Sequence, residues 1–145
     1  MLELLQPETG QKIMDVGAGS CWTTALLAEL TGEQGKVIAL ERLKSLSEFG
    51  RQNLKKGHWP QAMVYHANGV HGWPAEAPYD RILVSAAAPE VPVALIHQLA
   101  IGGRLVMPLR DYYGNMLLLT KIPDGRLHRE THAGFAFVPF ILTDE

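Results

Sequence analysis

Residues 12–20 read Lys12-Ile13-Met14-Asp15-Val16-Gly17-Ala18-Gly19-Ser20, and they form the most informative stretch of the chain. The mostly apolar residues 12–16 predict a buried strand. The two glycines that follow predict a turn, and the helical pattern of 22–30 begins directly after it. A strand, a glycine turn and a helix in this order are typical of a ligand-binding corner, because glycines let a ligand approach the backbone and the helix amides point at it.

Strand and helix patterns alternate along the rest of the chain. We expect further strands over 36–40, 62–67, 81–84 and 104–109, and helices over 22–30, 43–56 and 91–99. Residues 70–79 are expected to form a loop with at most one helical turn. Residues 116–122, the turn 123–125 and a last strand ending near Leu142 predict a closing antiparallel pair. This alternation predicts one α/β domain over 1–145, with a doubly wound, mostly parallel sheet of seven strands that binds ligands at the carboxyl ends of its strands.

The composition is that of an ordinary folded domain and excludes several classes of protein. The 145 residues are 47% hydrophobic, which supports one core, and 13 basic and 15 acidic residues give a net charge of −2. A nearly neutral chain argues against a nucleic-acid partner. No apolar run is long enough to span a membrane, and the first residues lack the pattern of a signal peptide, so we expect no membrane partner and a cytoplasmic location. Six scattered histidines give no metal site, and a lone cysteine gives no internal disulfide.

The glycine turn favours a cofactor that carries positive charge. A dinucleotide-binding turn would need a third glycine at the position of Trp22, so that motif fails. Asp15 lies two residues before the first glycine, where a negative charge suits a positive group and does not suit a pyrophosphate. S-adenosyl-L-methionine, with its sulfonium and ammonium, meets this requirement. We favour it over a turn that merely packs helix on strand, because a strand and a helix lie on the proper sides of the glycines.

Two further strand ends supply candidates for the same site. Glu41 follows the second strand, 22 residues after Gly19, where a carboxylate can accept two hydrogen bonds from ribose hydroxyls. Asn68 and Gly69 end the third strand, where the amide can bond an adenine edge, although a simple Asn-Gly turn explains this pair equally well. The predicted cofactor-binding residues are therefore Asp15, Gly17, Ala18, Gly19, Ser20, Glu41, Arg42, Asn68 and Gly69.

The loop that ends the fourth strand is the candidate substrate site. Strands one and four are neighbours at the switch point, so this loop is expected to face the glycine turn. Its small side chains leave room for a substrate backbone, although packing alone would explain the alanines better. The predicted substrate-binding residues are Ser85, Ala86, Ala87, Ala88 and Pro89. Cys21 lies at a helix start, where a thiol pKa is expected to be lowered, but no base is visible and we interpret it as a small packing residue.

Several motifs, in order, resemble those of the protein-L-isoaspartate O-methyltransferases, a family of class I S-adenosylmethionine-dependent methyltransferases. The similarity covers nearly the whole chain, and Ala86-Ala87-Ala88-Pro89 is its most family-specific part. The motifs are Leu4-Leu5-Gln6-Pro7 with Gly10, the stretch Asp15–Ser20, Gly35-Lys36-Val37 to Glu41-Arg42, Ala77-Pro78-Tyr79-Asp80-Arg81-Ile82, Ser85–Pro92, Gly102-Gly103-Arg104-Leu105-Val106 with Pro108, and Phe137-Val138-Pro139.

The resemblance implies a Rossmann-like methyltransferase fold with the strand order 3-2-1-4-6-5-7. It implies that Gly17, Gly19 and Glu41 hold the cofactor, with Asn68 and Gly69 at the adenine. Loop 85–89 would border the isoaspartyl protein or peptide that is methylated, and S-adenosyl-L-homocysteine would be the product. Two residues depart from the family pattern, since the family usually has glycine where this chain has Cys21 and aspartate where it has Asn68.

The resemblance also implies an N-terminal segment with a Thr-Ile-Ser motif that covers the cofactor, and nothing in the 145 residues matches it. Three explanations stay open: a truncated relative, a lid supplied by another subunit or protein, or a loss of repair activity. The reaction itself needs no general base, because a carboxylate with a pKa near 4 is already ionised at pH 7. The protein has to align the reactants and exclude water, so we expect weak or no isoaspartyl repair by this chain alone.

Two other functions compete with an active methyltransferase. One is a non-catalytic S-adenosylmethionine-binding module that acts through a partner or as a homo-oligomer. A large exposed apolar patch would favour it. The other is a dehydrogenase, against which the failed third glycine and the position of Asp15 both argue.

Overall fold

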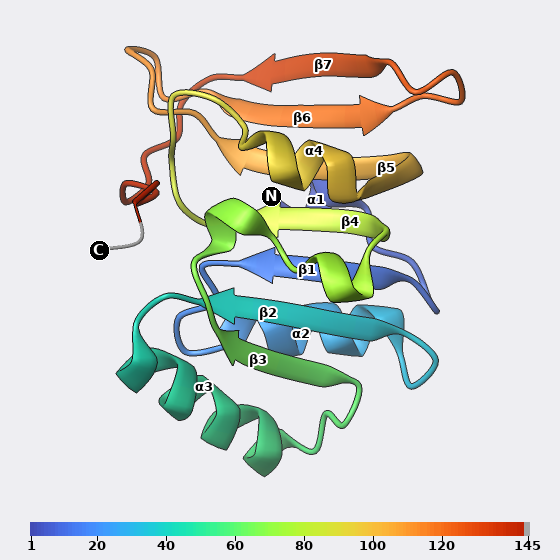
Figure 1. Cartoon of the computed structure of the whole chain (residues 1–145), viewed down its shortest axis with the longest axis vertical. Coiled ribbons are helices and arrows are strands. Elements are labelled where there is room, and N and C mark those ends of the chain that lie inside the picture. The colour runs from blue at the N-terminus through green and yellow to red at the C-terminus, as the bar shows by residue number, and fades with distance from the viewer. Residues whose placement is uncertain (144–145) are drawn as a thin grey trace.

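The computed structural model describes residues 1–143 and consists of one sheet with helices on both faces (Figure 1). The elements in chain order are α1 (Leu2–Leu5), β1 (Lys12–Val16), α2 (Trp22–Thr31), β2 (Lys36–Glu41), α3 (Lys44–Gly57), β3 (Ala62–His66), the 3₁₀ turns η1 (Gly69–His71) and η2 (Pro74–Glu76), β4 (Tyr79–Val84), α4 (Val93–Gln98), β5 (Leu99–Pro108), β6 (Met116–Lys121) and β7 (Leu127–His132).

The seven strands lie in the order β3-β2-β1-β4-β5-β6-β7. Strands β1 to β5 are parallel, and β6 and β7 pair antiparallel with their predecessors. This confirms the mostly parallel α/β sheet with an antiparallel C-terminal pair. The implied strand order 3-2-1-4-6-5-7 is wrong. The connections 109–115 and 122–126 hold no helix, so each strand turns back onto its chain neighbour and no crossover forms.

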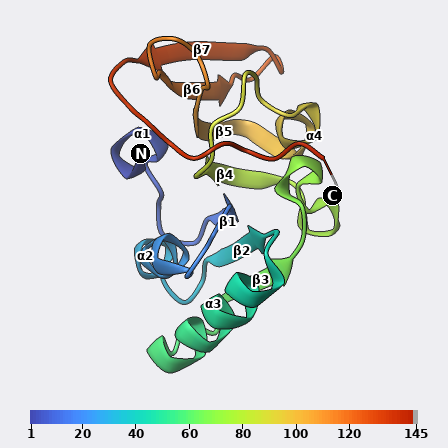
Figure 2. The ribbon, with the colours of Figure 1, turned by 90° about the vertical axis from the view of Figure 1, so that its left-hand side faces the viewer.

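The helices form two layers around the sheet (Figure 2). Helices α1, α2 and α3 cover one face, where Leu5, Leu27 and Leu54 are buried. Helix α4 and the two 3₁₀ turns cover the other face, where Tyr79 and Leu95 are fully buried. Strands β1 and β4 lie between the layers, which explains why nearly all of their residues are buried.

Several element boundaries differ from the sequence-based expectation. Helix α4 is shorter than predicted, and β5 begins at Leu99, so Gly102 and Gly103 lie inside the strand and do not end the helix. The register between β4 and β5 shifts between Tyr79 and Arg81, and such an irregularity accommodates glycines within a strand. The expected loop 70–79 contains parts of two 3₁₀ turns where at most one helical turn was expected.

The end of the chain departs most from the expectation. Strand β7 ends at His132, well before the predicted end near Leu142. Residues 133–143 instead cross the carboxyl edge of the sheet, in front of β5 and β4 in Figure 2. They are held there by the loop after β4, since Ala87 N donates to Val138 O at 2.7 Å and Phe140 N donates to Ala87 O at 2.7 Å.

Residues 1–143 contain neither a membrane-spanning helix nor a cluster of metal ligands. None of the helices there combines the length and the apolar character that a membrane crossing requires. In the same part of the chain, no three His, Cys, Asp or Glu side chains gather closely enough to hold a metal ion.

Candidate functional site: a cavity at the carboxyl edge of the sheet

A cavity of about 340 Å³ opens where β1, β2 and β4 end, at the switch point of the sheet. This volume lies at the small end of the range for ligand pockets, which is about 300–1,000 Å³. Its walls come from five segments of chain that are distant in sequence. They are Val16, Gly17 and Gly19; Leu40, Glu41, Arg42, Leu43 and Leu46; Asn68 and Gly69; Ser85 and Ala86; and Val138, Pro139, Phe140 and Ile141.

The glycine turn forms one wall with its backbone. Gly17 and Gly19 have φ angles of 80° and 54°, a region that L residues with a side chain rarely adopt. A Cβ on Gly19 would meet no atom within 4 Å, so a side chain there would extend into open space. Gly17 N and Ala18 N both donate to Leu40 O, at 2.9 and 3.1 Å, and these bonds fasten the turn to the end of β2.

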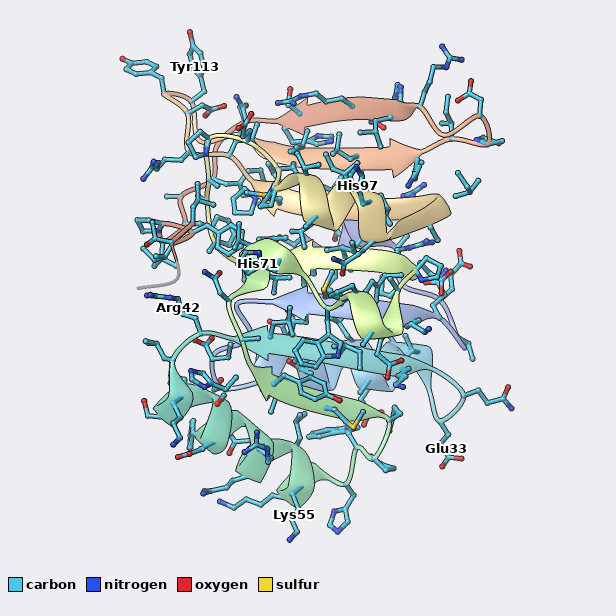
Figure 3. The ribbon with its side chains drawn as sticks, in the orientation of Figure 1. Glu33, Arg42, Lys55, His71, His97 and Tyr113 are labelled. Atoms are coloured by element: carbon cyan, nitrogen blue, oxygen red, sulfur yellow. The ribbon has the colours of Figure 1, made fainter. Side chains whose placement is uncertain are left out.

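Glu41 connects the turn to the end of β2. Its Oε2 accepts a hydrogen bond from Gly19 N, and its Oε1 accepts one from Leu43 N, each at 2.8 Å. Each carboxylate oxygen can accept a second hydrogen bond, so the buried side chain can still receive two ligand hydroxyls. The neighbouring Arg42 lies at the same edge of the molecule (Figure 3).

Asp15 lies beneath the turn and does not line the cavity. The side chain is fully buried, its Oδ2 accepts a hydrogen bond from Thr24 Oγ1 at 2.7 Å, and its Oδ1 has no hydrogen-bond partner among the described residues. Burial raises the pKa of Asp15 to about 6, the nearby Glu41 charge adds to the rise, and the Thr24 hydrogen bond opposes it. Asp15 therefore places a buried negative charge behind the cavity wall.

Cys21 supports the turn from the side of α3. It has a φ of 64°, which explains why glycine suits this position, and its side chain is buried against Gly50. The expected lowering of its thiol pKa is wrong, because burial, assisted by the Asp15 and Glu41 charges, raises the pKa to about 11 against the opposing Thr24 hydrogen bond. The interpretation as a packing residue agrees with this environment.

Asn68 and Gly69 form the opposite wall. Asn68 begins the 3₁₀ turn η1, with Oδ1 accepting from Val70 N at 3.1 Å, and its Nδ2 donates to Thr143 O at 2.9 Å. A Cβ on Gly69 would overlap Val16 Cγ1, so only glycine allows the turn to approach the end of β1 this closely.

The predicted substrate loop only partly lines the cavity. Ser85 and Ala86 reach it, Ala87 and Ala88 are buried beneath residues 138–140 and 110, and Pro89 is exposed. Ala18 and Ser20 are likewise near the turn but outside the lining. The cavity is also lined by residues that the sequence did not predict as site residues: Val16, Leu40, Leu43, Leu46 and 138–141. Val138 and Pro139 belong to the Phe137-Val138-Pro139 motif, but nothing in a single strand-like segment indicates that it crosses the site.

Known structures share this architecture. A protein-L-isoaspartate O-methyltransferase structure aligns with 95% of this chain and 44% of its own chain, with a TM-score of 0.89 and 24% identity. A β-aspartate methyltransferase (PCMT) of Plasmodium falciparum, solved in complex with S-adenosyl-L-homocysteine, aligns with 98% of this chain and 70% of its own, with a TM-score of 0.83 and 26% identity. The fold is that of the class I S-adenosylmethionine-dependent methyltransferases.

Sequence comparison identifies the family within this class. The family model for protein-L-isoaspartate(D-aspartate) O-methyltransferase (PCMT) matches residues 1–145, and the chain belongs to this family. A protein-L-isoaspartate O-methyltransferase of Methanopyrus kandleri is 48% identical over 143 residues, and one of Aeropyrum pernix is 46% identical. Each alignment covers 97% of this chain but only 63% and 55% of the relatives, so the chain spans about three-fifths of the length of these proteins.

Proposed function

We propose that this chain binds S-adenosyl-L-methionine in the edge cavity and transfers its methyl group to the free carboxylate of isoaspartyl residues in proteins or peptides. One observation carries the proposal: the Glu41 carboxylate and the open glycine backbone meet in one cavity, in a chain of the PCMT family. The relatives that bear this family name support the substrate class.

The residues of the cavity suit the cofactor. Glu41 would accept the ribose hydroxyls, Gly17 and Gly19 would lie against the chain that bears the sulfonium, and Asn68 with Gly69 would border the adenine. Asp15 would favour the positively charged cofactor from behind the turn, through its buried charge. Arg42, Ala18 and Ser20 complete the proposed cofactor site.

The chemistry asks little of the protein's side chains. S-adenosylmethionine, when bound, supplies a methyl group on a positively charged sulfur. The isoaspartyl carboxylate is ionised at neutral pH, so no residue has to remove a proton. This chain's part is to hold the two reactants in line and to keep water out, and such alignment is worth about 7–11 kcal/mol in favourable cases. Loop 85–89 would border the substrate at the mouth of the cavity.

The extra length of the relatives bears on the expected activity. Alignment and exclusion of water depend on everything that covers the reactants. We therefore propose that isoaspartyl repair by this chain alone is slower than repair by the longer Methanopyrus kandleri relative. A second subunit or another protein that covers the cavity would raise the rate.

The first test is calorimetric titration of the chain with S-adenosyl-L-homocysteine, with NAD as the control ligand. We expect micromolar binding of the former alone. A methyl-transfer assay then compares an isoaspartyl peptide with the same peptide carrying ordinary aspartate. Binding of NAD, or of neither ligand, would overturn the cofactor assignment, and equal methylation of both peptides would overturn the substrate assignment.

A further inference from the structure

Gln98 lies on the other side of the sheet from the glycine turn, at the end of α4, and contacts the segment that carries one wall of the cavity. It is 7% exposed. Its Oε1 accepts a hydrogen bond from Trp73 N, and its Nε2 donates one to His71 O, each at 2.8 Å. A single side chain thereby bonds the backbone on both sides of Gly72, the residue that follows η1.

The fit around Gln98 is close. Gly72 has a φ of 62°, and a Cβ there would lie 2.6 Å from Gln98 Nε2, so the backbone passes directly over the amide. The fully buried Tyr79 adds a third bond, since its Oη donates to Trp73 O at 2.7 Å. The Trp73 ring also stacks on Tyr65, with 4.3 Å between ring centroids.

The segment needs these bonds because no strand holds it. Asn68 and Gly69, which line the cavity, begin η1 directly after β3, and residues 69–73 form no sheet pairing. Gly72 N donates to Gly69 O at 3.0 Å, so the bonds that fasten residues 71 and 73 help to locate the cavity wall at Gly69, together with the contacts of Asn68 described above. Figure 3 shows His71 on this turn and His97 on the facing α4.

We propose that Gln98 is a positioning residue that fixes the adenine-side wall of the cofactor cavity; this rests on the proposed function. Gln98 touches neither reactant and acts through the backbone of residues 69–73.

The test uses Gln98→Leu, which removes both bonds, and His97→Gln, an exposed change on the same helix, as the matched control. We expect Gln98→Leu to weaken S-adenosyl-L-homocysteine binding about tenfold. The nucleoside 5′-methylthioadenosine should lose the same factor, because it shares the adenosine part that the wall contacts. Exchange of the Trp73 amide hydrogen should become faster. His97→Gln should change none of these.

A merely structural glutamine would give a different result. It would lower Tm and leave both affinities of the folded protein within about twofold of the original, and that outcome would overturn the proposal. If Gln98→Leu does not fold, Gln98→Met, which has a side chain of matched length and no amide, takes its place under the same criteria. Failure of the unaltered chain to bind S-adenosyl-L-homocysteine would instead overturn the proposed function, and the role of Gln98 with it.

Discussion

Glu41 joins two parts of the proposed cofactor site, because its two oxygens accept hydrogen bonds from the Gly19 and Leu43 amides. In Glu41→Gln, one acceptor oxygen becomes an NH₂ group that faces a backbone N–H and cannot accept from a ribose hydroxyl. We expect the dissociation constant for S-adenosyl-L-homocysteine to rise at least about tenfold, measured by calorimetry.

The control for this prediction is Glu48→Gln. Glu48 is an exposed carboxylate on α3, so the variant removes the same charge without touching the cavity. Equal effects of the two variants on the dissociation constant would show that net charge matters and the Glu41 contacts do not.

Asp15 makes stability depend on pH. Its pKa is about 6 in the folded chain, chiefly through burial, against an ordinary value of 3.8. Because the folded state binds this proton more tightly than the unfolded state, its contribution to the free energy of unfolding falls as pH rises from about 4 to 6 and is constant above that. The full change is on the order of 2–3 kcal/mol.

Denaturant titrations of the chain and of Asp15→Asn between pH 4 and 8 measure this effect. Groups distant from Asp15 titrate equally in both proteins, so the difference between the two profiles reports Asp15 together with its coupling to Glu41. We expect the difference to change across pH 4–6 and to be flat from pH 7 to 8. Parallel profiles over the whole range would contradict the assigned pKa.

At the scale of elements, helix α3 approaches the glycine turn most closely at Gly50. A Cβ on Gly50 would overlap Cys21 Sγ and lie 3.2 Å from Gly19 O. We expect Gly50→Ala to lower the free energy of unfolding by about 1–3 kcal/mol, measured in denaturant. Alanine gains about 1 kcal/mol of helix propensity over glycine, which works in the opposite direction.

The same substitution in a Cys21→Gly background gives the matched comparison. With the thiol gone, the overlap with Sγ disappears and the helix-propensity gain remains. Gly50→Ala should then be neutral or stabilising. An equal loss of stability in both backgrounds would mean that the Gly19 carbonyl, and not Cys21, limits the approach of α3.

The C-terminal segment lies in a different place from the one that its sequence pattern predicts. Residues 133–142 have a strand-like apolar sequence, and the expectation was a hairpin partner for 116–122. Only 127–132 pair with β6, and the apolar residues after them close one side of the cavity. The local sequence pattern indicates that a segment is extended, but tertiary contacts decide what it pairs with, and here these are the bonds to Ala87.

Over the whole molecule, the sequence indicates most of the sheet and the core of the site. The parallel strands β1 to β4 were predicted correctly, and the glycine turn and Glu41 lie at the strand ends where they were expected, because each depends on local signals: periodicity, glycine and the residue at a strand end. That these residues bind the cofactor stays a prediction. The wrong order of β5 to β7 came from the family resemblance, since the residues themselves predict antiparallel neighbours at this end of the chain. The Asp15–Thr24 contact and the Gln98 bonds were not predictable. They join residues that are distant in the chain or depend on burial, and neither is encoded in local spacing.

The stability of the whole domain should report cofactor binding. A ligand that binds only the folded chain adds about 2.7 kcal/mol at a free concentration of about one hundred times its dissociation constant. For a domain of this size, that corresponds to a rise in Tm of about 5–10 °C. We expect this rise with S-adenosyl-L-homocysteine and none with NAD at the same concentration, measured by calorimetric melting.

Glu41→Gln at that ligand concentration should show a smaller rise, because the same free ligand is then a lower multiple of its dissociation constant. A full rise in Glu41→Gln would place the ligand away from the glycine turn, and equal rises with both ligands would show that the cavity does not discriminate between them.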